Sequence, residues 1–279
     1  MNSKHKLLSE TFYAEYGTVS TSVRRNSPYI RRCGWSHKKN YLTSFMLLLI
    51  MFMISFLNYG QANHIILYFQ NKAGNKTLET DSVYQNSFGE PFTVRTFRYY
   101  ISNIVAEDNS TGERQSFPDQ YFLVDNADAA SERIELETTL KHISSFYFLL
   151  GVDSLKNVAG VQAGNLDPAK GMFWTWNTGY VMAKLEGNSP AAQTPMHAFS
   201  YHVGGYKQNE KTSREINFIL PQVVDCKNCT ITMNADVLQW FNAVNEIKIA
   251  DTPFCHEPGK LAAKLADNYS KMFSIADVQ

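Results

Sequence analysis

The sequence lacks the short motifs that mark many enzyme active sites, and it also lacks a net charge. It contains no G-x-S-x-G nucleophile elbow, P-loop, dinucleotide fingerprint or H-E-x-x-H zinc motif. Its 26 basic and 26 acidic side chains balance, and the first 62 residues hold eight of the basic and two of the acidic ones. The remainder is therefore acidic, which disfavours nucleic-acid binding. We expect neither an enzyme nor a nucleic-acid-binding protein.

Long hydrophobic runs are scarce as well, because one apolar stretch, LTSFMLLLIMFMISFLNYGQA at residues 42–62, stands out from the rest. Basic residues precede this run and a small-x-small motif ends it. Positive charge, apolar run and small-residue cleavage motif are the three parts of a secretory signal. We expect residues 1–62 to be an N-terminal extension plus signal peptide, with cleavage before Asn63. The mature chain, 63–279, is then periplasmic or secreted, without a membrane contact. The alternative is a signal anchor, because the run is close to the shortest bilayer-spanning length of about 17 residues.

Cysteine is rare, and after removal of the leader the chain keeps Cys226, Cys229 and Cys255. The segment CKNC has no following His for haem attachment and no βαβ pattern around it, so it resembles neither a cytochrome nor a thioredoxin motif. Two interpretations remain. One is a disulfide, either Cys226–Cys229 or one of these with Cys255. The other places thiols together with His256 on a soft metal ion such as Cu(I) or Zn(II).

Short runs rich in β-branched and aromatic residues fill the mature chain and alternate with Gly/Asn/Pro/Asp loops. This pattern predicts an all-β fold, a β-sandwich of antiparallel strands in one domain spanning 63–279. Two short C-terminal helices are expected. One covers residues 235–244 with Asp236 as its cap, and the other covers 261–273 with a stripe of Leu261, Leu265, Tyr269 and Met272.

The segment GMFWTWNTGY at residues 171–180 places two tryptophans two positions apart. In a regular strand, Trp174 and Trp176 would share one face with Met172 and Tyr180. That face is expected to be core, a stacking platform or part of a metal site. Large aromatic side chains contribute burial in each case.

Five segments distributed over most of the mature chain form a recognisable set: FRYYISNI, GVDSLKNVAGVQAGNLDPAKGMFWTWNTGY, AKLEG, FSYHVGG and ADNYSKMF. Together they resemble the MbnP-like (MopE/MbnP-related) family of exported copper proteins. The resemblance implies a β-sandwich that handles copper outside the cytoplasm. In the best-known members copper lies between histidine imidazoles and a kynurenine made by oxidising a tryptophan, in some cases by a partner dihaem enzyme.

The resemblance implies candidate residues for a copper site. His202, in FSYHVGG, is the first choice for a ligand, and His64, His197 or His256 is expected to supply a second. Trp174 and Trp176 stand in the tryptophan-bearing motif, so either is a candidate for conversion to kynurenine by a periplasmic dihaem oxidase. The mature chain, 63–279, has no Trp-x-His pair of the kind expected for such a site.

Three function classes compete at this point. The first is an exported copper-binding protein that stores, buffers or transfers copper. The second is a metal-free extracytoplasmic ligand-binding or adhesion module that uses a Trp/Tyr face, which requires both tryptophan rings to be accessible. The third is an enzyme, which would need a cluster of titratable groups that the sequence does not display at readable spacing.

Overall fold

The computed structural model describes residues 45–51, 62–176 and 179–279. The chain divides into two units, Met1–Asn58 and Tyr59–Gln279. In the first unit, residues 45–51 of the apolar run form a helix with exposed side chains. The rest of the predicted signal, including the first two residues of the predicted cleavage motif, lies outside the described residues. None of the helices in the described ranges has the length and hydrophobicity needed to span a bilayer.

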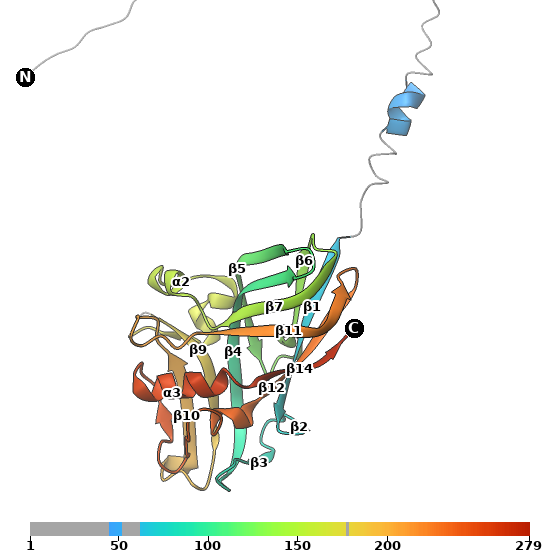
Figure 1. Cartoon of the computed structure of the whole chain (residues 1–279). Helices are drawn as coiled ribbons and strands as arrows, with labels where there is room; N and C mark the ends of the chain where they lie inside the picture. The colour runs from blue at the N-terminus through green and yellow to red at the C-terminus, as the bar shows by residue number, and fades with distance from the viewer. Residues whose placement is uncertain (1–44, 52–61, 177–178) are drawn as a thin grey trace, which may run out of the picture. The chain divides into compact units, whose positions relative to one another are not determined.

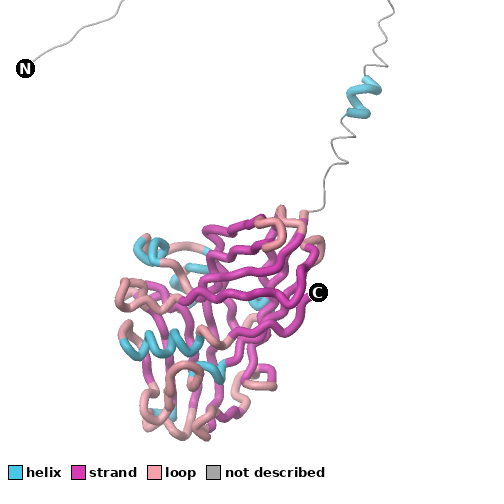
Figure 2. The backbone as a smooth tube through the Cα atoms, viewed as in Figure 1, coloured by secondary structure: helices cyan, strands magenta, loops and turns pink. Residues whose placement is uncertain are grey.

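The second unit is a β-sandwich, as predicted, built from two sheets (Figures 1 and 2). The smaller sheet has the order β14-β12-β1-β2, with β6 also paired to β1. The larger has the order β11-β7-β4-β9-β10-β13, with β3 and β5 paired to β4 and β8 paired to β9. The strands are β1 Asn63–Ala73, β2 Lys76–Thr77, β3 Val83–Gln85, β4 Pro91–Asp108, β5 Glu113–Asp125, β6 Arg133–Thr138, β7 His142–Leu150, β8 Phe173–Trp174, β9 Gly179–Asn188, β10 Ala198–Gly204, β11 Arg214–Asp225, β12 Cys229–Asp236, β13 Phe254–Cys255 and β14 Phe273–Val278.

Most strand pairs are antiparallel, in agreement with the prediction. Two pairs are parallel, namely β1 with β12 and β10 with β13. The direction of pairing could not be read from the sequence, because alternation of polar and apolar residues places a side chain on a face without specifying the neighbouring strand.

The main core lies between the two sheets and is rich in aromatic rings. Phe69 of the smaller sheet meets Tyr99 and Phe148 of the larger one edge to face, at centroid distances of 6.1 and 6.0 Å. A second, smaller core lies on the opposite face of the larger sheet. Consecutive residues Tyr99 and Tyr100 belong to the first and second core respectively, because neighbouring side chains of a strand point to opposite faces. The segment between β7 and β9 covers this second core.

The two predicted C-terminal helical segments differ in length. Residues Val237–Trp240 form a single 3-10 turn, in which Asp236 Oδ1 accepts a hydrogen bond from the backbone N–H of Leu238 at 3.0 Å. The turn does not continue to residue 244, because Asn242 forms a bridge with Glu246 and the chain reverses. The second segment is helix α3, Lys260–Tyr269, and the chain after it forms β14.

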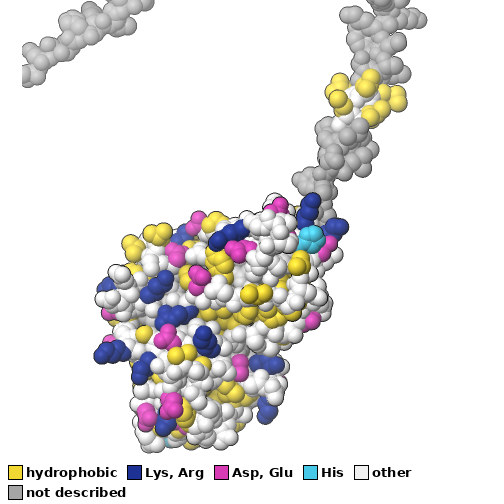
Figure 3. All heavy atoms as spheres, in the orientation of Figure 1, with side chains coloured by type: hydrophobic (Ala, Val, Ile, Leu, Met, Phe, Trp, Pro, Cys, Tyr) yellow, Lys and Arg dark blue, Asp and Glu magenta, His cyan; other side chains and the backbone are white. Residues whose placement is uncertain are grey.

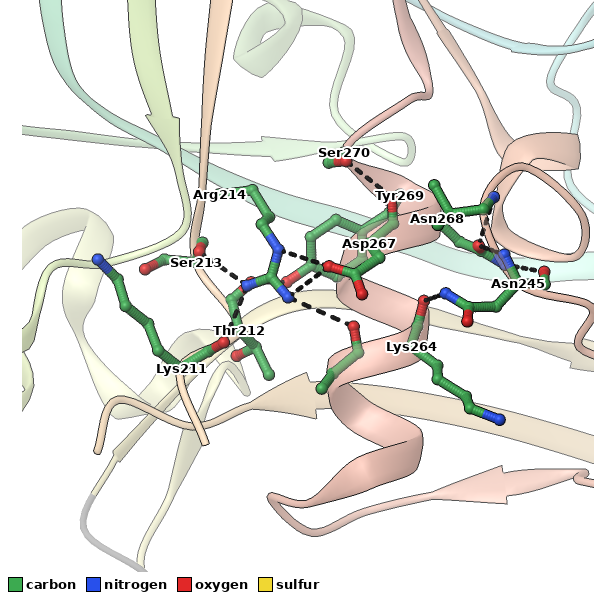
Figure 4. A network of polar contacts seen from close by, with 12 residues as sticks. Lys211, Thr212, Ser213, Arg214, Asn245, Lys264, Asp267, Asn268, Tyr269 and Ser270 are labelled. Atoms are coloured by element: carbon green, nitrogen blue, oxygen red, sulfur yellow. Dashed lines mark hydrogen bonds and ion pairs between the residues drawn. The ribbon is translucent and has the colours of Figure 1, made fainter. Parts of the chain in front are cut away.

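A polar network fixes α3 to the larger sheet (Figure 4). Arg214 donates to Asp267 Oδ1 from Nε at 3.0 Å and from Nη2 at 2.8 Å. The buried Tyr269 hydroxyl donates to the carbonyl of Thr212. On the other side of the helix, the Asn268 amide donates to the carbonyls of Trp240 and Asn245. These contacts hold the last turn of α3 in place.

The sandwich has an open side where the edge strands β11 and β14 lie next to each other. On the face drawn in Figure 3, hydrophobic side chains form a band where Figure 1 places these two strands. A shallow pocket at this position is lined by Ile219 and Ile275, and Ile219 is 83% exposed.

Candidate functional site

Four polar side chains gather on the outer face of the hairpin β9–β10. His202 is the cross-strand partner of Lys184, and Ser200 is the partner of Glu186. Residues between them, such as Leu185 and Tyr201, are fully buried in the main core. Because side chains alternate along a strand, the four polar residues share the face that points away from this core.

His202 and Glu186 form the closest contact of the group. His202 Nε2 lies 2.6 Å from Glu186 Oε1, and both side chains are about one-fifth exposed, at 22% and 21%. The hydrogen bond from His202 is the main reason why the pKa of Glu186 is lowered to about 2. The carboxylate is therefore ionised at neutral pH and acts as a hydrogen-bond acceptor.

His256 joins the group from a different part of the chain. It follows β13, whose Phe254 and Cys255 pair in parallel with Ser200 and Tyr201 of β10. The imidazole rings of His256 and His202 have centroids 4.5 Å apart, with an interplanar angle of 35°. Partial burial, together with the neighbouring His202, lowers the pKa of His256 below its usual range.

The Ser200 hydroxyl lies between the two imidazoles. Its Oγ is 3.1 Å from His202 Nε2 and 2.9 Å from His256 Nε2. His202 Nε2 also faces the Glu186 carboxylate, which can only accept, so this nitrogen carries the proton. The single hydroxyl proton of Ser200 is then directed to His256 Nε2. The pair thus consists of one donor nitrogen and one acceptor nitrogen, whose lone pair becomes available to a metal ion once the Ser200 hydrogen bond breaks.

The two tryptophans differ sharply in exposure. Trp174 is 7% exposed and belongs to the second core, while Trp176 is 64% exposed. The prediction that both share one face is wrong, because β8 ends at Trp174 and a turn begins at Thr175. Their ring centroids are nevertheless 5.3 Å apart.

Gly204 explains why Trp174 packs so close to the hairpin. A Cβ atom at this position would lie 2.7 Å from Cζ3 of Trp174 and 2.7 Å from the carbonyl oxygen of Tyr180. Glycine therefore allows the indole ring to rest directly on β10, two residues after His202.

Two cations attach the tryptophan-bearing loop to the sheet. Lys184 Nζ donates to the carbonyl of Gly171 at 2.6 Å, and Arg98 Nη1 donates to the carbonyl of Lys170 at 3.1 Å. Arg98 is the cross-strand partner of Lys184, and its Nε forms an ion pair with Asp125 Oδ2 at 2.8 Å that is not aligned as a hydrogen bond. Burial lowers the pKa of Lys184. Both cations thus fix the loop just before Trp174.

A surface pocket of about 390 Å³ opens beside the histidine pair. It is lined by Trp176, Phe254, His256 and the segment that leads into α3. The fold therefore brings Trp176 to the same pocket as a histidine, although the mature chain, 63–279, lacks a Trp-x-His pair.

The other two predicted ligands lie elsewhere. His64 is in β1 of the smaller sheet, where its Nδ1 is 3.3 Å from Glu135 Oε1 without a well-aligned hydrogen bond. His197 is exposed on the 3-10 turn before β10, and its Nδ1 lies 2.9 Å from the carbonyl of Ala192. Of the four histidines expected as ligands, the structure brings His202 and His256 together.

The three cysteines of the described residues, Cys226, Cys229 and Cys255, are free and buried. Burial raises the pKa of Cys226 and Cys255 to about 11 and that of Cys229 to about 12. Cys255 points into the main core, whereas His256 next to it points outward. Across residues 45–51, 62–176 and 179–279, no three or more His, Cys, Asp or Glu side chains are arranged to hold a metal ion. The structure thus does not gather thiols and His256 into one site.

Reasoning from the sequence missed Ser200 and Lys184, and it did not connect Glu186 with His202. A signal was present, because AKLEG and FSYHV each alternate polar and apolar residues. Aligning these two strands as a hairpin would have placed all four polar residues on one face.

Comparisons with known proteins identify relatives of the chain. The model of the MbnP family matches residues 62–257. Among solved structures, the chain is similar to MbnP from Methylosinus trichosporium, with 14% sequence identity and a TM-score of 0.48. That alignment covers 65% of this chain and 78% of the other. Among curated proteins, no match is found.

Proposed function

Because the chain belongs to the MbnP family, we propose that it is an exported copper-binding protein that stores, buffers or transfers copper. The observation that carries this proposal is the imidazole pair, in which Nε2 of His202 and Nε2 of His256 both lie about 3 Å from Ser200 Oγ. His256 lines an open pocket, so an ion has access to this side of the pair.

The donor set suits copper as a cargo. Imidazole nitrogens are favourable ligands for copper in either oxidation state. His202 and His256 would hold the ion in place of the hydrogen bonds that Ser200 now makes with both rings. His202 Nε2 would first lose its proton, because a ligating imidazole nitrogen must be unprotonated. Glu186 supplies a negative charge 2.6 Å from His202 Nε2, which offsets part of the charge of a bound cation.

Trp176 is the better candidate for oxidation to kynurenine. Its ring is 64% exposed and lines the pocket beside His256, whereas Trp174 is 7% exposed within the second core. A periplasmic dihaem oxidase acting on this residue is the partner that we propose. The role proposed for the chain itself is binding and release of copper, without catalysis.

A second candidate function is a metal-free ligand-binding module. The version in which both tryptophan rings form a platform is not supported, because Trp174 is buried. A smaller platform remains, since Trp176 and Phe254, at 64% and 45% exposure, line one pocket. Such a pair of rings suits stacking against a planar organic ligand.

Copper titration of the exported, purified chain tests the first proposal. Stoichiometric binding is expected for the unaltered protein, with its loss in His202→Ala and in His256→Ala. His142→Ala is the matched control, because His142 is an exposed histidine at the start of β7. Unchanged copper content in both site variants, or no binding by the unaltered protein, would contradict the proposal.

Peptide mass mapping of residues 171–184 extends the same experiment. Kynurenine at Trp176 and intact Trp174 is the expected pattern in copper-replete cells. If the protein binds no copper and Trp176 fluorescence responds instead to a planar organic compound, the ligand-binding function replaces the copper function.

A further inference from the structure

The segment CKNC, which the copper site does not use, marks a structural junction. Strand β11 ends at Asp225 in the larger sheet, and β12 begins at Cys229 in the smaller one. The chain therefore crosses from one sheet to the other within these few residues. Figure 1 shows β11 passing into β12 near the end of the domain where β1 begins.

Both cysteines of this junction are held rigidly and face the same interior. Cys226 and Cys229 are each 0% exposed and belong to the main core. The backbone of Cys226 is bonded on both sides, because its N–H donates to Lys141 and its carbonyl accepts from the N–H of His64, at 2.8 and 2.9 Å. Cys229 is fixed as the parallel partner of Ile65 in β1.

The two thiols, which are free in the structure, are separated by a turn short enough to allow a disulfide. Lys227 and Asn228 separate them, and Lys227 N–H donates to Asp225 Oδ1 at 2.9 Å, which tightens the turn. Residues three apart in a turn have Cα atoms within about 7 Å. A disulfide requires a Cα separation of about 4.4–6.8 Å, so the two ranges overlap. The charge of Cys226 also contributes to the raised pKa of Cys229, as expected for neighbouring thiols.

Cys255 does not compete for this partner. It lies in β13, at the opposite edge of the larger sheet from β11. Five strand spacings separate the two edges, which corresponds to about 24 Å in a sheet with a spacing of about 4.8 Å. The odd cysteine is therefore Cys255, which stays buried against α3 and β10.

We propose that Cys226 and Cys229 are oxidised to a disulfide that closes the crossover between the two sheets, and that Cys255 remains a thiol. The two thiols form one S–S bond and give up two protons and two electrons to the disulfide of an exported dithiol oxidase, which becomes a dithiol. The reaction takes place during folding, because both sulfur atoms are inaccessible once the core has closed. The inference rests on the proposed export and is independent of copper binding.

Tryptic mapping provides a direct test, because the sequence separates the three cysteines. Cleavage after Arg214, Lys227, Lys248 and Lys260 places Cys226, Cys229 and Cys255 in three different peptides. The full chain is expressed with its own leader, and the extracytoplasmic fraction is alkylated under denaturing conditions without reductant and then digested. We expect peptides 215–227 and 228–248 to be found linked, with alkylated Cys255 in peptide 249–260.

Matched variants make the result decisive. Cys255→Ser should leave the linked pair intact, and Cys226→Ser should turn Cys229 into an alkylated thiol. Reduction before alkylation should separate the linked peptides and leave one alkyl group on each of Cys226 and Cys229. Alkylation of all three cysteines in the exported chain, or a link that involves Cys255, would overturn the proposal. Absence of the chain from the extracytoplasmic fraction would remove its premise, whatever the outcome of copper titration.

Discussion

The two faces of the hairpin β9–β10 use the same backbone for different purposes. On the inner face, Leu185, Phe199 and Tyr201 are fully buried among aromatic rings. On the outer face, half-buried polar side chains alternate with them, and His202 and Ser200 contact His256 there. Because side chains of a strand alternate, each residue can change on one face with little effect on the other. The inner-face residues of the hairpin thus stabilise the fold, and the outer-face residues that alternate with them form the candidate site.

The energetic contrast between the faces should be large. Full burial of a large apolar side chain contributes about 1.5–3 kcal/mol. A partly exposed ion pair contributes about 0–1 kcal/mol. Substitutions on the inner face should therefore reduce the free energy of unfolding, whereas those on the outer face should mainly change ligand binding.

The largest effect is expected from truncation on the inner face. Phe199 contacts the rings of Phe92, Tyr201 and Phe241 and is 0% exposed. Phe199→Ala should lower the free energy of unfolding by about 3–5 kcal/mol, because it leaves a cavity. Urea unfolding measures this change. A loss below about 1 kcal/mol would mean that the inner face is not the stabilising one.

A smaller effect is expected where the hairpin meets the second core. Gly204→Ala would place a methyl group 2.7 Å from Trp174, so it should lower the free energy of unfolding by about 1–3 kcal/mol and shift the emission of that indole. Gly112→Ala is the control, because its φ of 76° strains the backbone but nothing lies within 4 Å of the added carbon. Equal emission spectra for the two variants would contradict the close packing of Trp174.

Next in size is the tether of the tryptophan loop. Lys184→Met removes the hydrogen bond to Gly171 and should lower the free energy of unfolding by about 1 kcal/mol. It should also accelerate amide exchange over residues 171–176 and weaken copper binding by about tenfold, at the lower end of the effect that loss of a supporting contact has at metal sites. Lys207→Met, on the exposed surface, is the matched control. Unchanged exchange in the loop would show that Arg98 suffices as a tether.

The smallest effect is a pH dependence on the outer face. The folded-state pKa of Glu186 is lowered from its ordinary value of 4.5 to about 2, chiefly by the hydrogen bond from His202. Its ionised form therefore stabilises the fold above about pH 4.5, and this contribution is lost as the pH falls toward 2. At pH 6, Glu186→Gln should lower the free energy of unfolding by up to about 1 kcal/mol. The difference in this free energy between the variant and the unaltered protein should shrink between pH 4.5 and 2. Urea unfolding curves at several pH values measure this free energy. A difference that stays constant with pH would show that ionisation of Glu186 is not its cause.

Features that depend on local patterns could be predicted from the sequence. The alternation of polar and apolar residues, together with the turn residues, predicted the β-sandwich. The apolar stripe with Leu265 and Tyr269 predicted α3, where both side chains are buried. The prediction that Trp174 and Trp176 share one face was wrong, because two aromatic residues at strand-like spacing do not guarantee that the strand continues. The chain turns after Trp174, and Trp176 leaves the buried face.

Features that depend on pairing between distant strands could not be predicted. His202 was identified as a candidate, but its neighbour could not be selected from His64, His197 and His256. The selection depends on the parallel pairing of β13 with β10, which aligns residues more than 50 positions apart. Residue spacing carries no information on that pairing, because both strands are short and β13 has two residues.

The position of β1 has a consequence for how the domain forms. This first strand of the sandwich lies between β6 and β12. Its parallel pairing with β12 places Ile65 opposite Cys229, which comes late in the sequence. Pairing of strands so far apart in sequence is a slow event, because a long loop must close before any contact is gained. A chain that emerges with its N-terminus first therefore has to keep β1 unpaired on one side until β12 arrives. Completion of the smaller sheet is thus a late step, and chaperone protection of β1 would matter most before it.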